Sequence, residues 1–294
     1  MAKLSLGLQL GYWGALAPGN SHVELAQEAE RLGYDSVWMA ESWGNDAFTP
    51  LAWIGANTEK IKLGTAVVQL SGRTPTSCAM HALTLDYLSG GRLILGLGVS
   101  GPQVVEGWYG RPFPKPLART REYIDIIRQV FARKAPVTSA GPHYPLPYDG
   151  EDGMGLGKPL KPIVHPLRDR SPIYIGAEGP KNIALAAEIA DGWLPLFYNP
   201  YDESVYADSL RDAPPDFDIA QMVTVNITDD IGAGLLAFKY FLSFYVGGMG
   251  AKSTNFHKNL FIRMGYEAEA EKIQQLFMED KRDEAARVIP DELA

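Results

Sequence analysis

The chain has 294 residues, of which 46% are hydrophobic, and a formal net charge of −8. This length and composition allow a buried core of barrel size, and the acidity argues against nucleic acid as a general partner. The single cysteine, Cys78, excludes an internal disulfide and favours a reducing compartment. Cys78 and His81 stand three apart on a predicted helix, but two ligands do not make a zinc site. We interpret them as a packed helix face and expect no metal.

Two apolar segments invite comparison with targeting or membrane sequences. The N-terminal segment lacks a signal-peptide core and cleavage site, so it is interpreted as the first strand. The stretch Ile231–Gly250 has Lys239 at its middle and Gly247-Gly248 near its end, which favours a buried helix over a membrane span. We therefore expect a soluble cytoplasmic protein with no membrane partner.

Strand and helix patterns alternate along the first part of the chain. The apolar segments that predict strands are Leu6–Leu10, Ser36–Ala40, Lys62–Val68 and Leu93–Gly98. Helical patterns connect them at about 23–32, 50–58 and 75–88. The third helix should end at Ser89-Gly90-Gly91, because glycine adopts positive φ at low cost. Strands bridged by helices in this way are typical of a parallel sheet.

The alternation is interrupted once and then resumes. After a helix at 117–132, residues 136–170 are rich in proline and glycine and form an insertion, with a small hairpin predicted between Val137–Ser139 and His143–Leu146. The later predicted strands are Ile173–Ile175, Trp193–Phe197 and Met222–Ile227, with helices at 182–190, 231–246 and 267–288. A closed barrel needs eight strands. We expect one barrel domain over residues 1–294, with its eighth βα unit absent or truncated.

Two glycine-rich loops follow predicted strands. The segment from Gly96 to Gly101 matches GxGxxG and fits three interpretations: a dinucleotide site, glycines that ease strand packing, or a barrel site for a phosphate or ring. The loop Gly176–Gly179 precedes a helix with Pro180 near its start. Its free N–H groups suit a phosphodiester, and the alternative is an ordinary βα turn.

Glu41 closes the second predicted strand and is the candidate for proton chemistry. Burial near Trp38 and Trp43 is expected to raise the pKa of its carboxyl group and suit it to proton transfer. Two alternatives stay open, a cap on the next helix and an ion pair with an arginine.

Three further sets of residues are considered. Basic residues of the insertion form either a solvated loop or a capture site for an anionic group: Lys158, Lys161, His165, Arg168 and Arg170. Aromatic residues that follow strands either wall a pocket for an apolar substrate or belong to the core: Trp108, Tyr109, Trp193, Phe197 and Tyr198. Histidines without the spacing of metal ligands are His22, His143 and His257.

Three blocks resemble the bacterial luciferase-like superfamily, in the branch that uses the deazaflavin coenzyme F420: Asp35–Trp43, Leu83–Gly110 and Pro172–Pro195. The resemblance implies an α/β fold, a TIM-type (β/α)8 barrel with an insertion after the fourth unit. It implies an oxidoreductase that transfers hydride between the deazaflavin C5 and a small organic substrate, and a homodimer. The alternatives are an FMN-dependent monooxygenase and a barrel that binds flavin or deazaflavin without turnover.

The resemblance also implies roles for single residues. It places a non-proline cis peptide between Ala66 and Val67, against the ring, and the phosphate-bearing tail at the loop from Gly176. The cofactor-binding residues so implied are Ala66, Val67, Gln69, Ser100, Gly101, Gly176, Ala177, Glu178 and Gly179. Several relatives have an acid followed by histidine where this chain has Glu41 and Ser42. The histidine's acid–base role therefore does not carry over, and Glu41 is the candidate catalytic residue.

Overall fold

The computed structural model describes residues 4–12, 21–250 and 255–294, and the chain forms two compact units. The first unit extends to Gly176 and adds Glu188–Leu194 and Pro215–Ile219. The second comprises Ala177–Ala187, Pro195–Pro214 and Ala220–Ala294. One barrel domain over residues 1–294 with an insertion at 136–170 stays a prediction.

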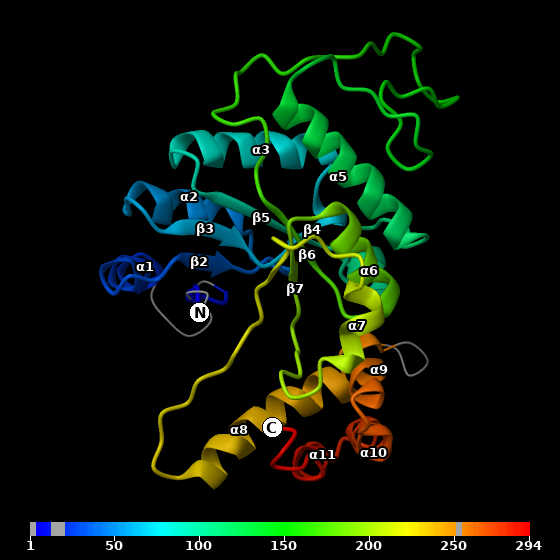
Figure 1. Cartoon of the computed structure of the whole chain (residues 1–294). Helices are drawn as coiled ribbons and strands as arrows, with labels where there is room; N and C mark the ends of the chain where they lie inside the picture. The colour runs from blue at the N-terminus through cyan, green and yellow to red at the C-terminus, as the bar shows by residue number, and fades with distance from the viewer. Residues whose placement is uncertain (1–3, 13–20, 251–254) are drawn as a thin grey trace. The chain divides into compact units, whose positions relative to one another are not determined.

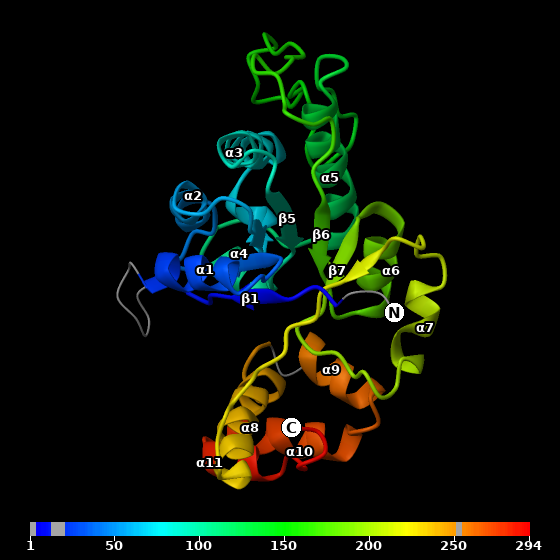
Figure 2. The same ribbon diagram turned by 60° about the vertical axis from the view of Figure 1, so that its left-hand side comes forward.

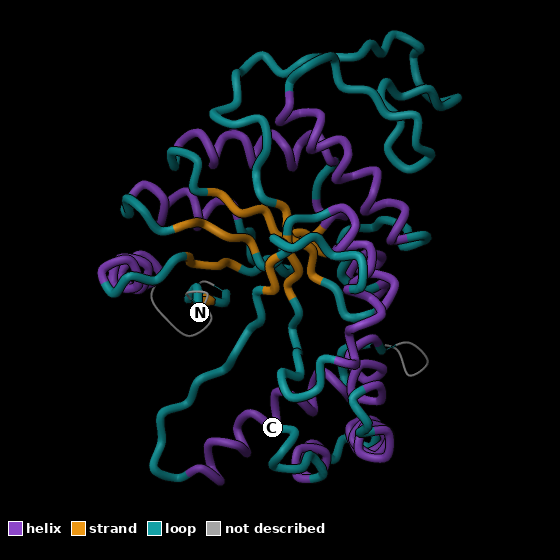
Figure 3. Tube along the Cα trace, viewed as in Figure 1, coloured by secondary structure: helices purple, strands orange, loops and turns teal. Residues whose placement is uncertain are grey.

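The first unit contains a curled sheet (Figure 3). Every pairing in it is parallel, as the sequence predicted. Its strands are β1 (Gly7–Gln9), β2 (Ser36–Met39), β3 (Lys62–Thr65), β4 (Val68–Gln69), β5 (Leu93–Gly98), β6 (Ile173–Gly176), β7 (Gly192–Leu194) and β8 (Asp218–Ile219). Their order is β1-β2-β3-β5-β6-β7-β8, and β4 pairs with β5. β5 is buried along its whole length, as its continuous apolar run predicted.

Three strand predictions need correction. The predicted strand Trp193–Phe197 is shorter in the structure, because β7 ends at Leu194. The predicted strand Lys62–Val68 is divided into β3 and β4 by a cis peptide between Ala66 and Val67. The predicted strand Met222–Ile227 is wrong, because this segment is exposed and without strand pairing, and β8 is the strand that pairs with β7. An apolar alternation predicts a strand only where a neighbouring strand is available to satisfy its backbone groups.

The helices of the first unit are α1 (Ser21–Arg31), α2 (Phe48–Ala56), α3 (Pro75–Leu88), α4 (Pro102–Gly107) and α5 (Pro116–Ala132). Figures 1 and 2 show α1, α2 and α3 along the outer side of β2, β3 and β5, which they contact. α3 has the predicted bounds. Thr74 caps it by accepting a hydrogen bond from the Ser77 N–H at 3.3 Å, and Gly90 and Gly91 follow with φ of 69° and 87°.

The insertion is fastened at the amino ends of the strands. Arg168 donates to Asp86 and to the Leu93 carbonyl, where β5 begins, and Arg170 pairs with Asp191, immediately before β7. Parallel barrels place ligands at the opposite, carboxyl edge. The anion-capture interpretation is therefore wrong for these two arginines, which hold the insertion to the sheet.

Within the insertion, the predicted hairpin is reduced to one bridge. Ser139 and Leu146 exchange two backbone hydrogen bonds of 2.9 Å, and Val137 instead pairs with Leu160. The hairpin strands are therefore shorter than the sequence predicted.

The second unit is mainly helical. Its helices are α6 (Pro180–Ile189, whose last two residues belong to the first unit), α7 (Ser204–Leu210), α8 (Ile231–Gly247), α9 (Phe256–Arg263), α10 (Glu267–Met278) and α11 (Arg282–Arg287). Phe197 forms ring contacts with Tyr245 at 5.5 Å and Phe261 at 5.3 Å. Among the described residues, no helix has the length and apolarity needed to span a bilayer.

Candidate active site

One row of residues crosses three strands at the carboxyl edge of the sheet. The register aligns Gln69 with Gly98, and Gly98 with Gly176. The cis peptide predicted between Ala66 and Val67 is present immediately before β4. The sequence-predicted residues of the first unit thus gather at the edge where parallel barrels bind ligands.

The two glycines of this row leave space for the Val67 side chain. A Cβ atom at Gly98 would lie 2.4 Å from Val67 Cγ2, and one at Gly176 would lie 3.1 Å from Val67 Cγ1. Real Cβ atoms do not approach other atoms as closely as the first of these distances. Glycine at these two positions therefore leaves the room that the Val67 side chain needs.

We predict that Gly98→Ala lowers the free energy of unfolding by about 1–3 kcal/mol, because the new methyl group overlaps Val67. Val67→Ala removes the overlapping atoms, so the double variant should be no less stable than Val67→Ala alone. Urea unfolding of the four proteins checks this. Gly107→Ala is the control, since a Cβ there meets no atom within 4 Å. A fully additive loss in the double variant would contradict the prediction.

Gln69 presents an unpaired acceptor at this edge. Its backbone N–H donates to Glu41 Oε1 at 3.1 Å, and its Nε2 donates to the Glu41 carbonyl at 3.2 Å. Its Oε1 is buried and has no hydrogen-bond partner, although only 6% of the residue is exposed. Buried acceptors are normally paired, so this oxygen fits a bound group that carries an N–H or O–H.

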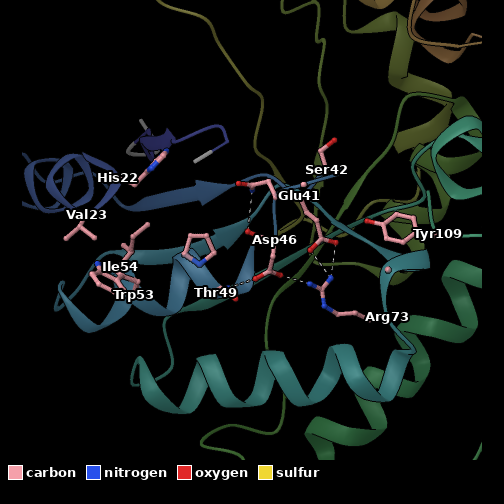
Figure 4. A pocket seen from close by; sticks show the side chains of 14 residues that line it. His22, Val23, Glu41, Ser42, Asp46, Thr49, Trp53, Ile54, Arg73 and Tyr109 are labelled. Atoms are coloured by element: carbon pink, nitrogen blue, oxygen red, sulfur yellow. Dashed lines mark hydrogen bonds and ion pairs between the residues drawn. The ribbon is translucent and has the colours of Figure 1, made fainter. Parts of the chain in front are cut away.

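Glu41 is an ion-pair partner of Arg73. Its two carboxylate oxygens accept hydrogen bonds from Arg73 Nη1 at 2.9 and 2.8 Å, and Arg73 Nη2 pairs with Asp46 (Figure 4). Burial lowers the pKa of the Arg73 guanidinium, but Glu41 and Asp46 outweigh it and hold that pKa above its usual value. Of the alternatives left by the sequence, the arginine pair is the one that the structure contains.

A cavity of about 680 Å³ opens beside this ion pair. Glu41, Arg73 and Tyr109 line one part of it, and side chains from the N-terminal part of α1 and from α2 line another (Figure 4). Its size is in the range of small-molecule sites. Glu41 therefore lies on a cavity wall.

The loop that follows β6 continues into the second unit, where Glu178 points its carboxyl group inward. Glu178 Oε1 accepts from the Leu196 N–H at 3.0 Å, and Oε2 is buried without a partner. Burial raises the pKa of this carboxyl from 4.5 to about 8, against the lowering effects of the Leu196 N–H and Arg263. The side chain is thus a buried group of its own unit, and only the Glu178 main chain is suited to the predicted loop role.

Gly179 is the open position of this loop. Its carbonyl accepts from the N–H groups of Asn182 and Ile183 in the first turn of α6, and a Cβ at Gly179 would meet no atom within 4 Å. Ala177 is buried, whereas Ser100 and Gly101, in the first unit, are partly exposed after β5. The loop and the residues after β5 therefore leave main chain accessible next to a helix start.

The aromatic residues that follow strands divide between the two interpretations. Tyr109 lines the cavity, and Trp108 is exposed. Trp193 belongs to the core of its unit, with 1% of its surface exposed, and Phe197 is buried in the aromatic cluster. Tyr198 stacks on Tyr206 with the ring centroids 4.8 Å apart.

Cys78 is buried on α3, and burial raises the pKa of its thiol to about 12. His81 is exposed and bonds the Ser77 carbonyl, so the packed-face interpretation is confirmed for Cys78.

The sequence did not indicate that Arg73, Asp46 and His22 line the cavity. Arg73 immediately precedes the cap of α3, and its basic charge after a buried strand was the available signal. Asp46 accepts from the Thr49 N–H at 2.7 Å in the first turn of α2, a position typical of a capping residue. For His22, the sequence showed only that its spacing is not that of a metal ligand.

This chain is similar to one protein family and to several named relatives. The family model described as luciferase-like monooxygenase matches residues 7–294. A protein of Mycobacterium tuberculosis with the provisional name coenzyme F420-dependent oxidoreductase is 60% identical, over 99% of this chain and 86% of its own length. The 5,10-methylenetetrahydromethanopterin reductase of Archaeoglobus fulgidus is 32% identical over 77% of this chain and 65% of its own, so this chain spans about two thirds of that relative.

A solved structure supports the same fold. The coenzyme F420-dependent tetrahydromethanopterin reductase of Methanopyrus kandleri superposes with a TM-score of 0.72 at 24% identity, covering 99% of this chain and 85% of that one. The predicted barrel-type α/β fold is therefore confirmed.

Proposed function

The chain belongs to the luciferase-like monooxygenase family, and on this basis we propose that it is a coenzyme F420-dependent oxidoreductase acting on a small organic substrate. The observation that carries the proposal is the 60% identity to a protein named for this activity, over 99% of the chain. The relatives named above are oxidoreductases and reductases, so the alternatives of FMN dependence and of a noncatalytic barrel are not needed.

The residues at the carboxyl edge fit a flat, hydrogen-bonding ring. Gln69 Oε1 is a buried acceptor without a partner, and Val67 fills the glycine row at Gly98 and Gly176. In the proposal, Ala66, Val67, Gln69, Ser100 and Gly101 hold the deazaflavin, and the main chain from Gly176 through Ala177 and Glu178 to Gly179 binds its phosphate-bearing tail. When bound, the deazaflavin supplies the donor or acceptor of hydride.

We propose that Glu41 and Arg73 are positioning residues for Gln69. Glu41 holds the Gln69 main chain and side chain in place, and Arg73 holds Glu41. The carboxylate is engaged on both oxygens, so we assign Glu41 a positioning part and leave proton transfer to a group that contacts the substrate.

The test is a fluorescence titration of the protein with oxidised F420, with FMN as the competitor. Saturable F420 binding with FMN bound far more weakly supports the proposal, and a preference for FMN would overturn it. Hydride transfer is then followed as loss of the deazaflavin absorbance with alcohols, or its return with enones and imines.

We predict that Gly179→Asp weakens F420 binding by at least about tenfold, whereas Gly179→Asn changes it little, because the two differ mainly in one negative charge near the tail. Both residues are favoured at a helix N-cap, so neither is expected to destabilise α6. Equal affinities of the Asp and Asn variants, measured by the same titration at low salt, would place the tail elsewhere.

A homodimer is also part of the proposal. Met80, Tyr87 and Leu88 of α3 are each more than half exposed and are spaced for one helix face. Light scattering at micromolar concentration gives the mass directly. The cytoplasmic location stays a prediction.

A further inference from the structure

The cavity beside Glu41 is built on the first unit alone and has the chemistry of a substrate site. Its volume of about 680 Å³ suits a small organic molecule. Apolar side chains line it from two helices, Val23 of α1 and Trp53 and Ile54 of α2 (Figure 4). Such walls favour an apolar or aromatic ligand body.

The charges on the wall disfavour anions. Among the described lining residues, Arg73 is the one arginine or lysine, and it is engaged by both Glu41 and Asp46. The two carboxylates therefore exceed the lining arginine by one negative charge. A ligand that carries a carboxylate or phosphate into this cavity would meet no available cation and would be repelled.

His22 adds a hydrogen-bonding requirement. It lines the cavity with only 7% of its surface exposed, and its Nε2 lies 3.0 Å from the Leu10 carbonyl oxygen. A carbonyl only accepts, so Nε2 carries the proton, and Nδ1 of the neutral ring is left as an acceptor. That buried Nδ1 has no partner. An unpaired acceptor favours a ligand that supplies a donor.

We propose that this cavity binds a neutral, largely apolar molecule with a hydroxyl group that donates a hydrogen bond to His22 Nδ1. That this molecule is the substrate rests on the proposed function. The substrate class is then a neutral alcohol, or the carbonyl compound formed from it, and phosphorylated or carboxylated substrates are excluded from this cavity.

Matched probes test the proposal on the whole chain without coenzyme. Benzyl alcohol, benzyl methyl ether and benzoate share a ring but present a hydroxyl donor, no donor and an anion. Nitrogen NMR of the imidazoles, with His22 assigned from His22→Gln, reports on Nδ1 directly. We expect benzyl alcohol to shift this signal saturably, the ether to bind about tenfold more weakly, and benzoate not to saturate.

Two variants and one control test the hydrogen bond to His22 separately from binding in the cavity. The His22→Gln side chain can still donate to the Leu10 carbonyl, and this variant should remove most of the preference for the alcohol over the ether. Val23→Phe fills the cavity and should abolish binding of both. His165→Gln is the matched control, because His165 is exposed in the insertion. Thermal unfolding of each variant shows whether it is folded.

Equal binding of alcohol and ether to the wild type, a preference unchanged in His22→Gln, or saturable benzoate binding would each overturn the inference. If His22→Gln does not fold, the wild-type probe series and Val23→Phe still decide. F420 titration of the same proteins is scored separately. If the wild type does not bind F420, the proposed function is overturned and the probe result stands. If the wild type binds F420 but does not prefer benzyl alcohol, only this inference is overturned.

Discussion

Replacement of Arg73 by methionine is expected to lower the free energy of unfolding by about 3–5 kcal/mol, because it leaves the Glu41 carboxylate buried without its cation. The side chain of Glu41 is only 4% exposed, so water replaces the guanidinium poorly. The same change should make Gln69 more mobile, since Glu41 accepts hydrogen bonds from both its backbone N–H and its side chain. Urea unfolding gives the magnitude.

The double variant Glu41→Gln with Arg73→Met identifies the cause. Removing the unpaired charge should recover most of the loss, and the coupling energy of the cycle measures the pair. Arg111→Met is the control, because Arg111 is exposed and outside the cavity. If the double variant is as unstable as Arg73→Met, the contact of the guanidinium with the Phe48 ring, whose centroid lies 5.2 Å from the guanidinium carbon, would be the stronger effect.

The second large effect is a pH dependence of stability that arises at Glu178. In the unfolded chain this carboxyl loses its proton near its ordinary pKa of 4.5, whereas in the folded protein burial raises the pKa to about 8. Between these values the folded protein binds more protons, so its free energy of unfolding falls as the pH rises. The stabilising contribution is complete below pH 4.5 and is lost above pH 8.

Glu178→Gln should remove this dependence. At about 1.4 kcal/mol per pKa unit, the variant should gain roughly 3–5 kcal/mol on the wild type between pH 4.5 and pH 8, and little beyond. Unfolding followed at intervals of one pH unit measures the change. Glu292→Gln, at an exposed position, is the control and should follow the wild type. A difference between Glu178→Gln and wild type that is constant with pH would show that the carboxyl is ionised throughout.

Much of the first unit could be predicted from the sequence, because the local patterns of its segments agree with the positions that these segments take in the fold. The apolar run of β5 and the glycines after α3 each specify their own element, and the observed bounds match. The segment Met222–Ile227 shows the limit. Its alternation is that of a strand, but pairing depends on a distant neighbour that a single pattern does not encode.

The main-chain geometry of the candidate site was predictable. Gln69, Gly98 and Gly176 align because parallel strands end at one edge, and the resemblance supplied the bulge at Ala66 and Val67. The sequence offered an arginine pair as one alternative for Glu41, but it did not identify which arginine forms the pair. The partner of Glu41 lies 32 positions away, and the direction of the Glu178 side chain depends on its contact with the Leu196 N–H.

The fastening of the insertion by Arg168 and Arg170 has a consequence for how the protein can change. These contacts lie at the amino ends of β5 and β7, whereas Gln69 and Gly98 lie at the carboxyl ends of their strands. Substitutions in the insertion can change stability or a binding partner, and substitutions at the carboxyl ends of the strands can change the chemistry. Because the two sets of residues lie at opposite edges of the sheet, their effects should be largely independent.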